Sequence, residues 1–252
     1  MVEVRHVTAG YGKEEILHDV SVPFAPGTVT TVLGPNGSGK STLLKTILGA
    51  LRPTGGEILV DGMDALGMAP GELAKQIAYL PQGKQVPDIT VGRLVLHGRF
   101  PYLSYPRHYR QEDHSIAREA MEWMGIWELR DKPLATLSGG LRQRVYIAMA
   151  LAQKAPVILM DEPTTYLDVA QQQKLTETIR QLAREGTTVV LVLHDLIQAI
   201  RLSDQMVVME DGCLRFRGTG DALLESGLIP QIWGVNIGKT ICQGKEQYFY
   251  LQ

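Results

Sequence analysis

One glycine-rich segment combines residue types that bind phosphate groups. It consists of Gly34, Pro35, Asn36, Gly37, Ser38, Gly39, Lys40, Ser41 and Thr42. This order matches the pattern GxxxxGK[ST], in which glycines let successive backbone N–H groups curl around an anion at a helix N-terminus. We expect Lys40 to reach the β- and γ-phosphates of a nucleoside triphosphate and the Ser41 hydroxyl to bind Mg²⁺. A glycine turn that happens to precede a helix is the alternative.

Two adjacent carboxylates follow the apolar run at 157–160. In P-loop enzymes an acid at such a strand end holds Mg²⁺, and we assign this role to Asp161. Glu162 is then placed to act as general base on a water aligned with the γ-phosphate. A second apolar run, 188–193, precedes His194, which we expect to contact the γ-phosphate or orient the water. Solvated acids and a structural histidine are the alternatives.

A second glycine site consists of Ser138, Gly139 and Gly140. Ser138 is a good N-cap, and the run at 141–153 behind it has the apolar stripe of a helix. The segment is either an ordinary capped helix or a second anion receptor. A compact domain cannot easily place both receptors on one phosphate, so we expect a second copy of the chain to supply the other.

The apolar pattern alternates short strand-like runs with longer helical ones. Strands are predicted at 2–9, 14–22, 29–33, 57–60, 77–80, 157–160, 188–193 and 206–209. Helices are predicted at 41–51, 91–98, 112–124, 141–153, 169–184 and 196–202. The order predicts a single α/β domain over 1–252, with a core at about 1–85 and 155–229, a helical insertion at about 86–154 and a small extension at about 230–252 that contains a hairpin around 243–245.

Composition excludes several classes of protein. The 252 residues contain 25 Lys plus Arg and 27 Asp plus Glu, a net charge of −2, which argues against nucleic acid as the main partner. With 44% hydrophobic and 21% charged residues, disorder is not expected. No apolar run approaches the roughly 20 residues of a membrane span, and the N-terminus has no apolar signal region. Cys213 and Cys242 form no CxxC pair, which fits a reducing compartment.

The sequence LSGGLRQR, located between the phosphate-binding segment and VILMDEP, resembles the signature of the ATP-binding cassette family, the ATPase subunits of ABC transporters. The resemblance extends from Tyr11 to about residue 218. It implies an α/β fold with a P-loop NTPase core, a mixed sheet, antiparallel N-terminal strands and a helical insertion. ATP and Mg²⁺ are the implied cofactors.

The resemblance also implies roles for individual residues. Tyr11 corresponds to the aromatic residue that stacks on adenine. Gln82 corresponds to the glutamine that contacts Mg²⁺ and water and relays the nucleotide state to a membrane subunit. Residues 138–140 would close on the ATP of the opposite cassette. Residues 165–168 would cross the dimer interface, with Asp168 as its acid, and His194 would be the switch histidine.

In such a family member, two copies sandwich two ATP molecules and hydrolysis lets the pair separate. The implied partners are a second copy, transmembrane permease subunits and, indirectly, a substrate-binding protein, at the cytoplasmic face of the membrane and without nucleic acid. Residues 97–102 (HGRFPY) and 161–168 (DEPTTYLD) resemble importers of iron-siderophores, haem and vitamin B12. Uptake of a metal chelate is therefore expected.

Other functions are weighed against this one. Another metal or oxyanion importer, an exporter and a non-transport cassette protein remain alternatives. A cassette acting on nucleic acid would usually carry basic arms, two cassettes or a coiled coil, whereas only 98 residues separate Lys40 from Ser138, without heptads. A degenerate binding module would lack Lys40, Glu162 or His194. Finally, Arg99, Arg107 and Arg110 are expected either to meet an acidic partner or to form a solvated surface.

Overall fold

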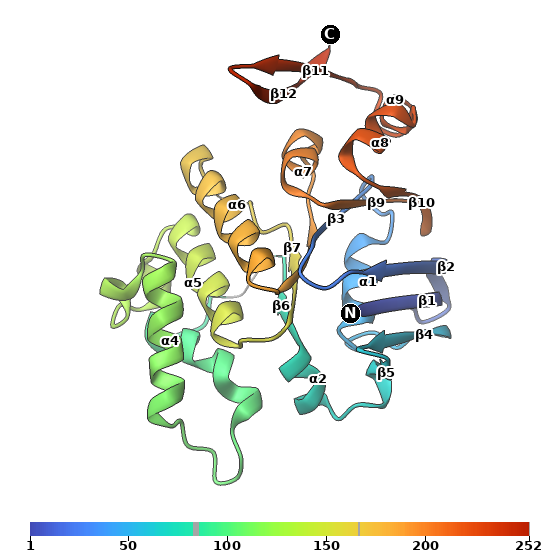
Figure 1. The fold of residues 1–252 in the computed structure, drawn as a ribbon. Coiled ribbons are helices and arrows are strands. Elements are labelled where there is room, and N and C mark those ends of the chain that lie inside the picture. Colours follow the sequence, from blue (N-terminus) through green and yellow to red (C-terminus); the bar gives the residue numbers. More distant parts are fainter. Residues whose placement is uncertain (83–85, 166, 252) are drawn as a thin grey trace.

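The computed structural model describes residues 1–82, 86–165 and 167–251, and these fold around a six-stranded sheet in the order β10-β9-β3-β8-β7-β6 (Figure 1). The strands are β3 (Val29–Leu33), β6 (Ile77–Leu80), β7 (Val157–Asp161), β8 (Thr188–Val192), β9 (Gln205–Glu210) and β10 (Cys213–Gly218). All neighbours pair in parallel except β9 and β10. The inner strands β3, β7 and β8 are buried along their whole length, which explains their continuous apolar sequences.

A second sheet is antiparallel and has the order β2-β1-β4-β5. Its strands are β1 (Val2–Tyr11), β2 (Glu14–Phe24), β4 (Gly55–Val60) and β5 (Met63–Asp64). Along β2 the buried and exposed side chains alternate, because one face of this sheet covers the core and the other faces solvent.

Two hydrophobic cores lie on opposite faces of the six-stranded sheet. Along β7, Ile158 and Met160 belong to one core, whereas Val157 and Leu159 belong to the other. Helix α1 (Lys40–Ile47) packs into the second core, between the two sheets. The first core is covered by the helices of the insertion together with α6 (Val169–Arg184) and α7 (Leu196–Leu202).

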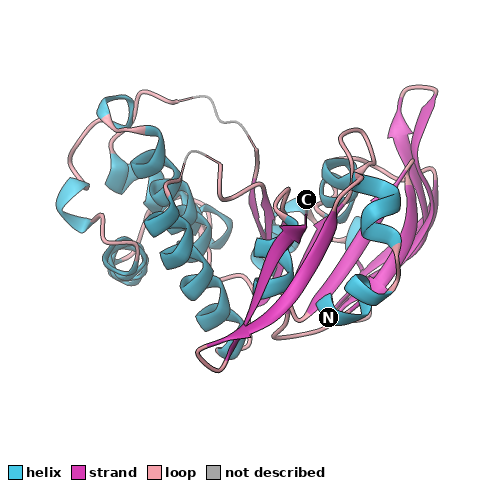
Figure 2. Cartoon of the chain, turned by 90° about the horizontal axis from the view of Figure 1, so that it is seen from above, coloured by secondary structure: helices cyan, strands magenta, loops and turns pink. Residues whose placement is uncertain are grey.

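The insertion consists of α3 (Val91–Leu96), α4 (Gln111–Trp123) and α5 (Gly139–Ala152), which pack on one another. Short 3₁₀ helices connect them: η2 (His97–Tyr102), η3 (Trp127–Leu129) and η4 (Leu134–Thr136). Viewed from above, these helices gather on one side of the molecule, and most of the strands lie on the other (Figure 2). The predicted α/β fold with a mixed sheet, antiparallel N-terminal strands and a helical insertion is confirmed.

Arg99 does not belong to a basic surface. Its side chain is buried, its Nε donates to Asp113 Oδ1 at 3.0 Å, and its Nη1 donates to the carbonyl of Ala152 at 3.0 Å. The guanidinium also lies 3.9 Å from the centre of the Tyr102 ring. This ion pair joins η2, the first turn of α4 and the end of α5, so Arg99 is not part of the expected basic surface, whereas Arg107 and Arg110 are exposed.

Several boundaries differ from the predictions. Helix α1 ends at Ile47 rather than 51, because Gly49 adopts the left-handed conformation (φ 74°) that terminates helices. The helices α2 (Pro70–Gln76), α8 (Gly220–Glu225) and α9 (Leu228–Trp233) were not predicted, since each is too short to show a period. The C-terminal hairpin of β11 (Asn236–Cys242) and β12 (Lys245–Leu251) is confirmed. Within the described ranges, no helix is long and apolar enough to cross a membrane.

Candidate functional site

The phosphate-binding segment connects the carboxyl end of β3 to the start of α1. Gly34, Gly37 and Gly39 have positive φ angles of 150°, 82° and 92°. A side chain at Gly34 would lie 2.1 Å from the carbonyl oxygen of Met209, so this position requires glycine. Asn36 and Gly37 are exposed at the tip, while Ser38 and Thr42 are buried. The segment therefore has the strand, loop and helix context that the motif requires.

Lys40 is buried beneath this loop. Its Nζ donates hydrogen bonds to the carbonyls of Gly34 at 2.8 Å and Pro35 at 2.7 Å. Burial lowers the pKa of the Lys40 ammonium, and the negative charges of Glu162 and Asp161 oppose this shift. The lysine is thus held at the loop, close to both acids.

The two acids end β7. Asp161 is 3% exposed, and burial raises the pKa of its carboxyl, with Ser41 opposing the shift by a hydrogen bond and Glu162 adding to it by charge repulsion. Glu162 has a φ of 51°, a left-handed conformation that is uncommon outside glycine, and its N–H donates to the carbonyl of Val192 at 3.2 Å. This backbone turn directs the two neighbouring carboxylates differently.

His194 lies two residues after β8, the strand next to β7. Its Nε2 is 2.6 Å from Glu162 Oε1. An ionised carboxylate only accepts hydrogen bonds, so in that state Nε2 is the donor in this contact. The structure therefore brings His194 and Glu162 together beside Lys40 and Asp161, at the carboxyl edge of the parallel strands.

Thr165 contacts Glu162 as well, a contact that the sequence does not predict. Its hydroxyl donates to Glu162 Oε2 at 3.4 Å, and its N–H donates to the Glu162 carbonyl at 3.3 Å. A hydroxyl three residues after an acid is a recognisable turn pattern, but the pattern does not show that the hydroxyl meets the carboxylate. Gln143, on α5, donates to the carbonyl of Pro163 at 2.9 Å in the same turn.

The second glycine segment is not part of this cluster. Ser138 is exposed and caps α5, where its Oγ accepts from the N–H of Leu141 at 3.4 Å. Gly139 and Gly140 form the first turn of α5, which packs on the sheet face opposite to α1. A single chain therefore holds the two glycine segments on different helices and different faces.

Three further candidate residues lie at the margins of the site. Tyr11, at the end of β1, is 49% exposed, and the Nζ of Lys45 on α1 lies 3.4 Å from its hydroxyl. Gln82 is exposed, two residues after β6, and Asp168 caps α6 through the N–H of Gln171 at 2.8 Å. Tyr166, within the segment 165–168, lies outside the described residues.

Comparisons with known proteins agree with this arrangement. The family described as ABC transporter matches residues 17–165. The iron(3+)-hydroxamate import ATP-binding protein of Bacillus subtilis is 39% identical over 229 residues, which cover 90% of this chain and 85% of that protein. The ferric enterobactin transport ATP-binding protein of Escherichia coli is 40% identical over 231 residues, covering 91% and 85%.

Solved structures show the same fold. A metal-chelate type ABC transporter in an inward-facing conformation superposes with a TM-score of 0.85 and 25% identity, covering 99% of this chain and 96% of that one. A dimeric bacterial ABC transporter cassette superposes with a TM-score of 0.77 and 31% identity, covering 87% and 98%. The chain belongs to the ABC transporter family and is one of its ATP-binding subunits, which hydrolyse ATP to drive transport.

Proposed function

We propose that this chain is the Mg²⁺-dependent ATPase subunit of an importer that takes up an iron-siderophore or another metal chelate. The observation that carries the catalytic part is the contact between Glu162 and His194 beside Lys40 and Asp161. These groups meet at the carboxyl edge of parallel strands, where ligands of open α/β sheets bind.

The nucleotide is held mainly by residues 34–42. Their backbone N–H groups and the N-terminus of α1 surround the phosphates, and Lys40 contributes the cation. The orphaned hydroxyl of buried Ser38 supports this assignment, because phosphate oxygens would give it a partner. Tyr11, exposed at the end of β1, stacks on the adenine.

The metal is held by Asp161, Ser41 and Gln82. Asp161 Oδ1 is buried without a hydrogen-bond partner, and a divalent cation offsets the cost of burying this carboxylate. Carboxylate and hydroxyl oxygens are ligands that Mg²⁺ prefers, together with substrate phosphates. When bound, Mg²⁺ neutralises negative charge on the phosphate oxygens.

Glu162 acts as general base on the attacking water, and His194 and Thr165 hold its two carboxylate oxygens. With both oxygens engaged, the carboxylate has a defined orientation and retains lone pairs for the water. His194 is half exposed, which leaves its ring accessible to the γ-phosphate of a bound nucleotide.

The complete enzyme is a dimer of two copies. Residues 138–140 of one copy close on the ATP held by the other, with Asp168 at the interface. The location of Ser138 and Lys40 at the starts of helices that belong to separate cores on opposite sheet faces supports this arrangement.

The cargo and the partners follow from the relatives. The closely similar proteins of B. subtilis and E. coli are named for iron(3+)-hydroxamate import and ferric enterobactin transport. We therefore assign to this chain a location at the cytoplasmic face of the membrane, on transmembrane permease subunits that receive cargo from a substrate-binding protein.

The ATPase assignment is tested with Glu162→Gln, which removes the base but keeps the shape of the side chain. We expect ATP binding to be retained, steady-state hydrolysis to fall about 10²–10⁴-fold, and an ATP-dependent dimer to appear in light scattering. The matched control is Glu185→Gln, in the turn after α6 and remote from the site. A substantially active Glu162→Gln protein contradicts the assignment.

The cargo is tested in the source cell. We expect disruption of the coding sequence to abolish growth on a ferric siderophore as sole iron source, and the intact chain, but not Glu162→Gln, to restore it. Growth on simple iron salts in excess is the control. Normal uptake of ferric siderophores by the disrupted strain would instead point to another metal or oxyanion importer or to an exporter.

A further inference from the structure

Three buried side-chain polar atoms lack a hydrogen-bond partner within the described part of the chain: Ser38 Oγ, Asp161 Oδ1 and Gln171 Oε1. Buried polar atoms are nearly always paired, so each exception calls for a missing partner. The first two atoms belong to the proposed nucleotide and metal site. Gln171 lies elsewhere, in the first turn of α6, and it lines a separate cavity.

This cavity, here called the α5–α6 cavity, has a volume of about 230 Å³. Helices α4, α5 and α6 enclose it, and Ile147 and Leu175 contribute to its apolar wall. Its charged lining consists of Arg144 from α5 and Lys174 from α6, and no Asp or Glu lines it. The cavity therefore brings together two positive charges from different helices, one on the partly buried Arg144 and one on the exposed Lys174.

Among the described residues, neither cation has a carboxylate partner. Arg144 is partly buried, and over the described ranges its guanidinium has neither an ion pair nor a hydrogen bond. Lys174 likewise has no carboxylate within 4.0 Å among those residues. No Arg144 nitrogen is among the buried unpaired atoms and Lys174 is exposed, so water reaches both cations. A bound anion would replace this water with charge-assisted acceptors.

Gln171 requires that the ligand also donate a hydrogen bond. Its Nε2 donates to Asp168 Oδ2 at 2.8 Å, and since a carboxylate can only accept, the amide nitrogen must face Asp168. The amide oxygen is therefore left as the unpaired acceptor. A ligand that satisfies the site must carry negative charge for Arg144 and also an O–H group for Gln171.

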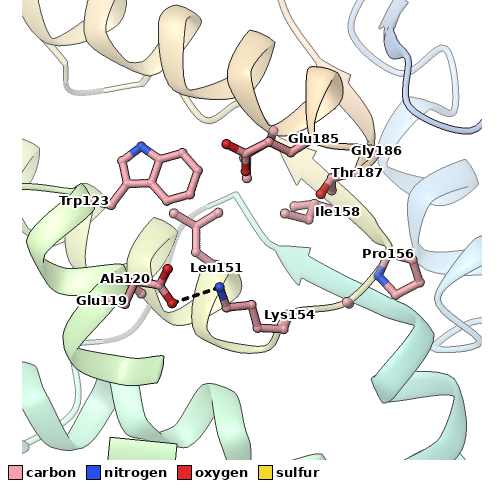
Figure 3. Close-up of a pocket in the computed structure, with 12 residues that line it drawn as sticks. Glu119, Ala120, Trp123, Leu151, Lys154, Pro156, Ile158, Glu185, Gly186 and Thr187 are labelled. Atoms are coloured by element: carbon pink, nitrogen blue, oxygen red, sulfur yellow. Dashed lines mark hydrogen bonds and ion pairs between the residues drawn. The ribbon is translucent and has the colours of Figure 1, made fainter. Parts of the chain in front are cut away.

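The neighbouring cavity shows the contrast (Figure 3). Trp123 lines both cavities, but in the neighbouring one Lys154 is already paired with Glu119 at 3.0 Å, and Glu185 adds a second carboxylate. Because its single cation is neutralised, that cavity has no comparable need for an anion. Of these two cavities, only the α5–α6 cavity has cations that lack a carboxylate partner among the described residues.

We propose that the α5–α6 cavity binds inorganic phosphate. At neutral pH this anion keeps an O–H group, which pairs with Gln171 Oε1, while its unprotonated oxygens accept from Arg144 and Lys174. Sulfate lacks the proton, and a phosphate monoester at neutral pH has mostly lost it. The site would join α5, which begins at Ser138, to α6, which is capped by Asp168.

The test measures the binding of labelled phosphate to the full chain by equilibrium dialysis. The P-loop is first saturated with a non-hydrolysable ATP analogue. We expect saturable binding, weakened at least about tenfold in Arg144→Gln and in Lys174→Gln, because a charge-assisted bond is lost. Lys154→Gln, in the neighbouring cavity, is the matched control and should bind within about twofold of the unmodified chain. Sulfate and glycerol 3-phosphate should compete at least about tenfold less well than phosphate.

Thermal melting supplies an independent measurement. Phosphate should raise the melting temperature of the unmodified chain above that seen with sulfate at equal ionic strength, and Arg144→Gln should lose this difference while remaining folded. If Arg144→Gln does not fold, Arg144→Lys and Lys174→Gln replace it. The proposal is overturned if phosphate does not bind, if it binds these variants as well as the unmodified chain, or if sulfate competes equally.

Discussion

The two glycine segments look alike in sequence but differ in how the fold uses them. Both precede a helix and expose backbone N–H groups. The first segment has its charged partners in the same chain. Lys40 donates hydrogen bonds to two carbonyls of the loop, and Asp161 and Glu162 lie close to Lys40. The second, at 138–140, is capped by its own Ser138 hydroxyl, and in the part of the chain that the structure describes no hydrogen bond or ion pair joins it to Lys40, Asp161, Glu162 or His194.

On the proposed function, one segment belongs to a nearly complete site within a single chain, and the other supplies half of a site. Their helices, α1 and α5, belong to separate hydrophobic cores on opposite faces of the same sheet. Rotation of a side chain cannot bring them to one phosphate. This separation supports the proposal that the second segment acts on a ligand held by another copy of the chain.

Lys40→Ala should have the largest effect, because it removes the cation from the complete site. We expect ATP hydrolysis to fall about 10²–10³-fold, the loss typical of a group that stabilises developing charge. ATP binding to the isolated chain should weaken as well, as measured with a fluorescent ATP analogue. Lys75→Ala, a surface substitution in α2, is the control. Unchanged nucleotide binding in Lys40→Ala would contradict the division into a complete and a half site.

Ser138→Arg should abolish hydrolysis in its own dimer but leave nucleotide binding to each chain within about twofold of normal, since Ser138 contacts only its own helix. In an equal mixture with Lys40→Ala, half of the dimers contain one competent site, and we expect roughly a quarter of the normal rate. The measurement is phosphate release after subunit exchange. A verified mixed dimer that remains inactive would argue against action across the interface.

Substitution of Thr165 should have a smaller effect, and it tests one contact within the complete site. Thr165→Val keeps the shape of the side chain but removes the bond to Glu162 Oε2, and the loss of about 1 kcal/mol corresponds to roughly a fivefold lower kcat. The KM for ATP should not change, because the hydroxyl positions the base and does not bind nucleotide. Thr165→Ser should restore the rate. If kcat and KM change together, or if Ser fails to rescue, Thr165 has only a structural role.

Much of the fold was predictable where the pattern is strong. The helices α6 and α7 begin and end at the predicted residues, because an apolar stripe of clear helical period is bounded by Asp168 and Asp195 as N-caps. The early end of α1 was not predicted, since Pro53 is a more obvious stop than the left-handed Gly49. Short helices such as α8 carry too few residues for a period.

The residues of the candidate site could largely be predicted from the sequence, but several contacts between them could not. Glycine spacing and strand-end acids identified Lys40, Asp161, Glu162 and His194, because this chemistry requires particular residue types near one another in the chain. The contact of Thr165 with Glu162 was not predicted, and the burial of Arg99 on Asp113 was missed for the same reason. In both cases the partner is chosen by packing, which local sequence does not encode.

The sequence by itself determined that the chain binds phosphate, that it has acids and a histidine at strand ends, and that a second glycine segment exists. These are local properties of spacing and residue type. Only the tertiary structure decided which of these groups meet: strand order places β7 beside β8, so His194 reaches Glu162, and the sheet separates α1 from α5. The pairing of strands and the filling of two cores depend on contacts between residues far apart in the chain. Those contacts also place Arg144 at a cavity that no motif marks, where no acceptor for it lies among the described residues.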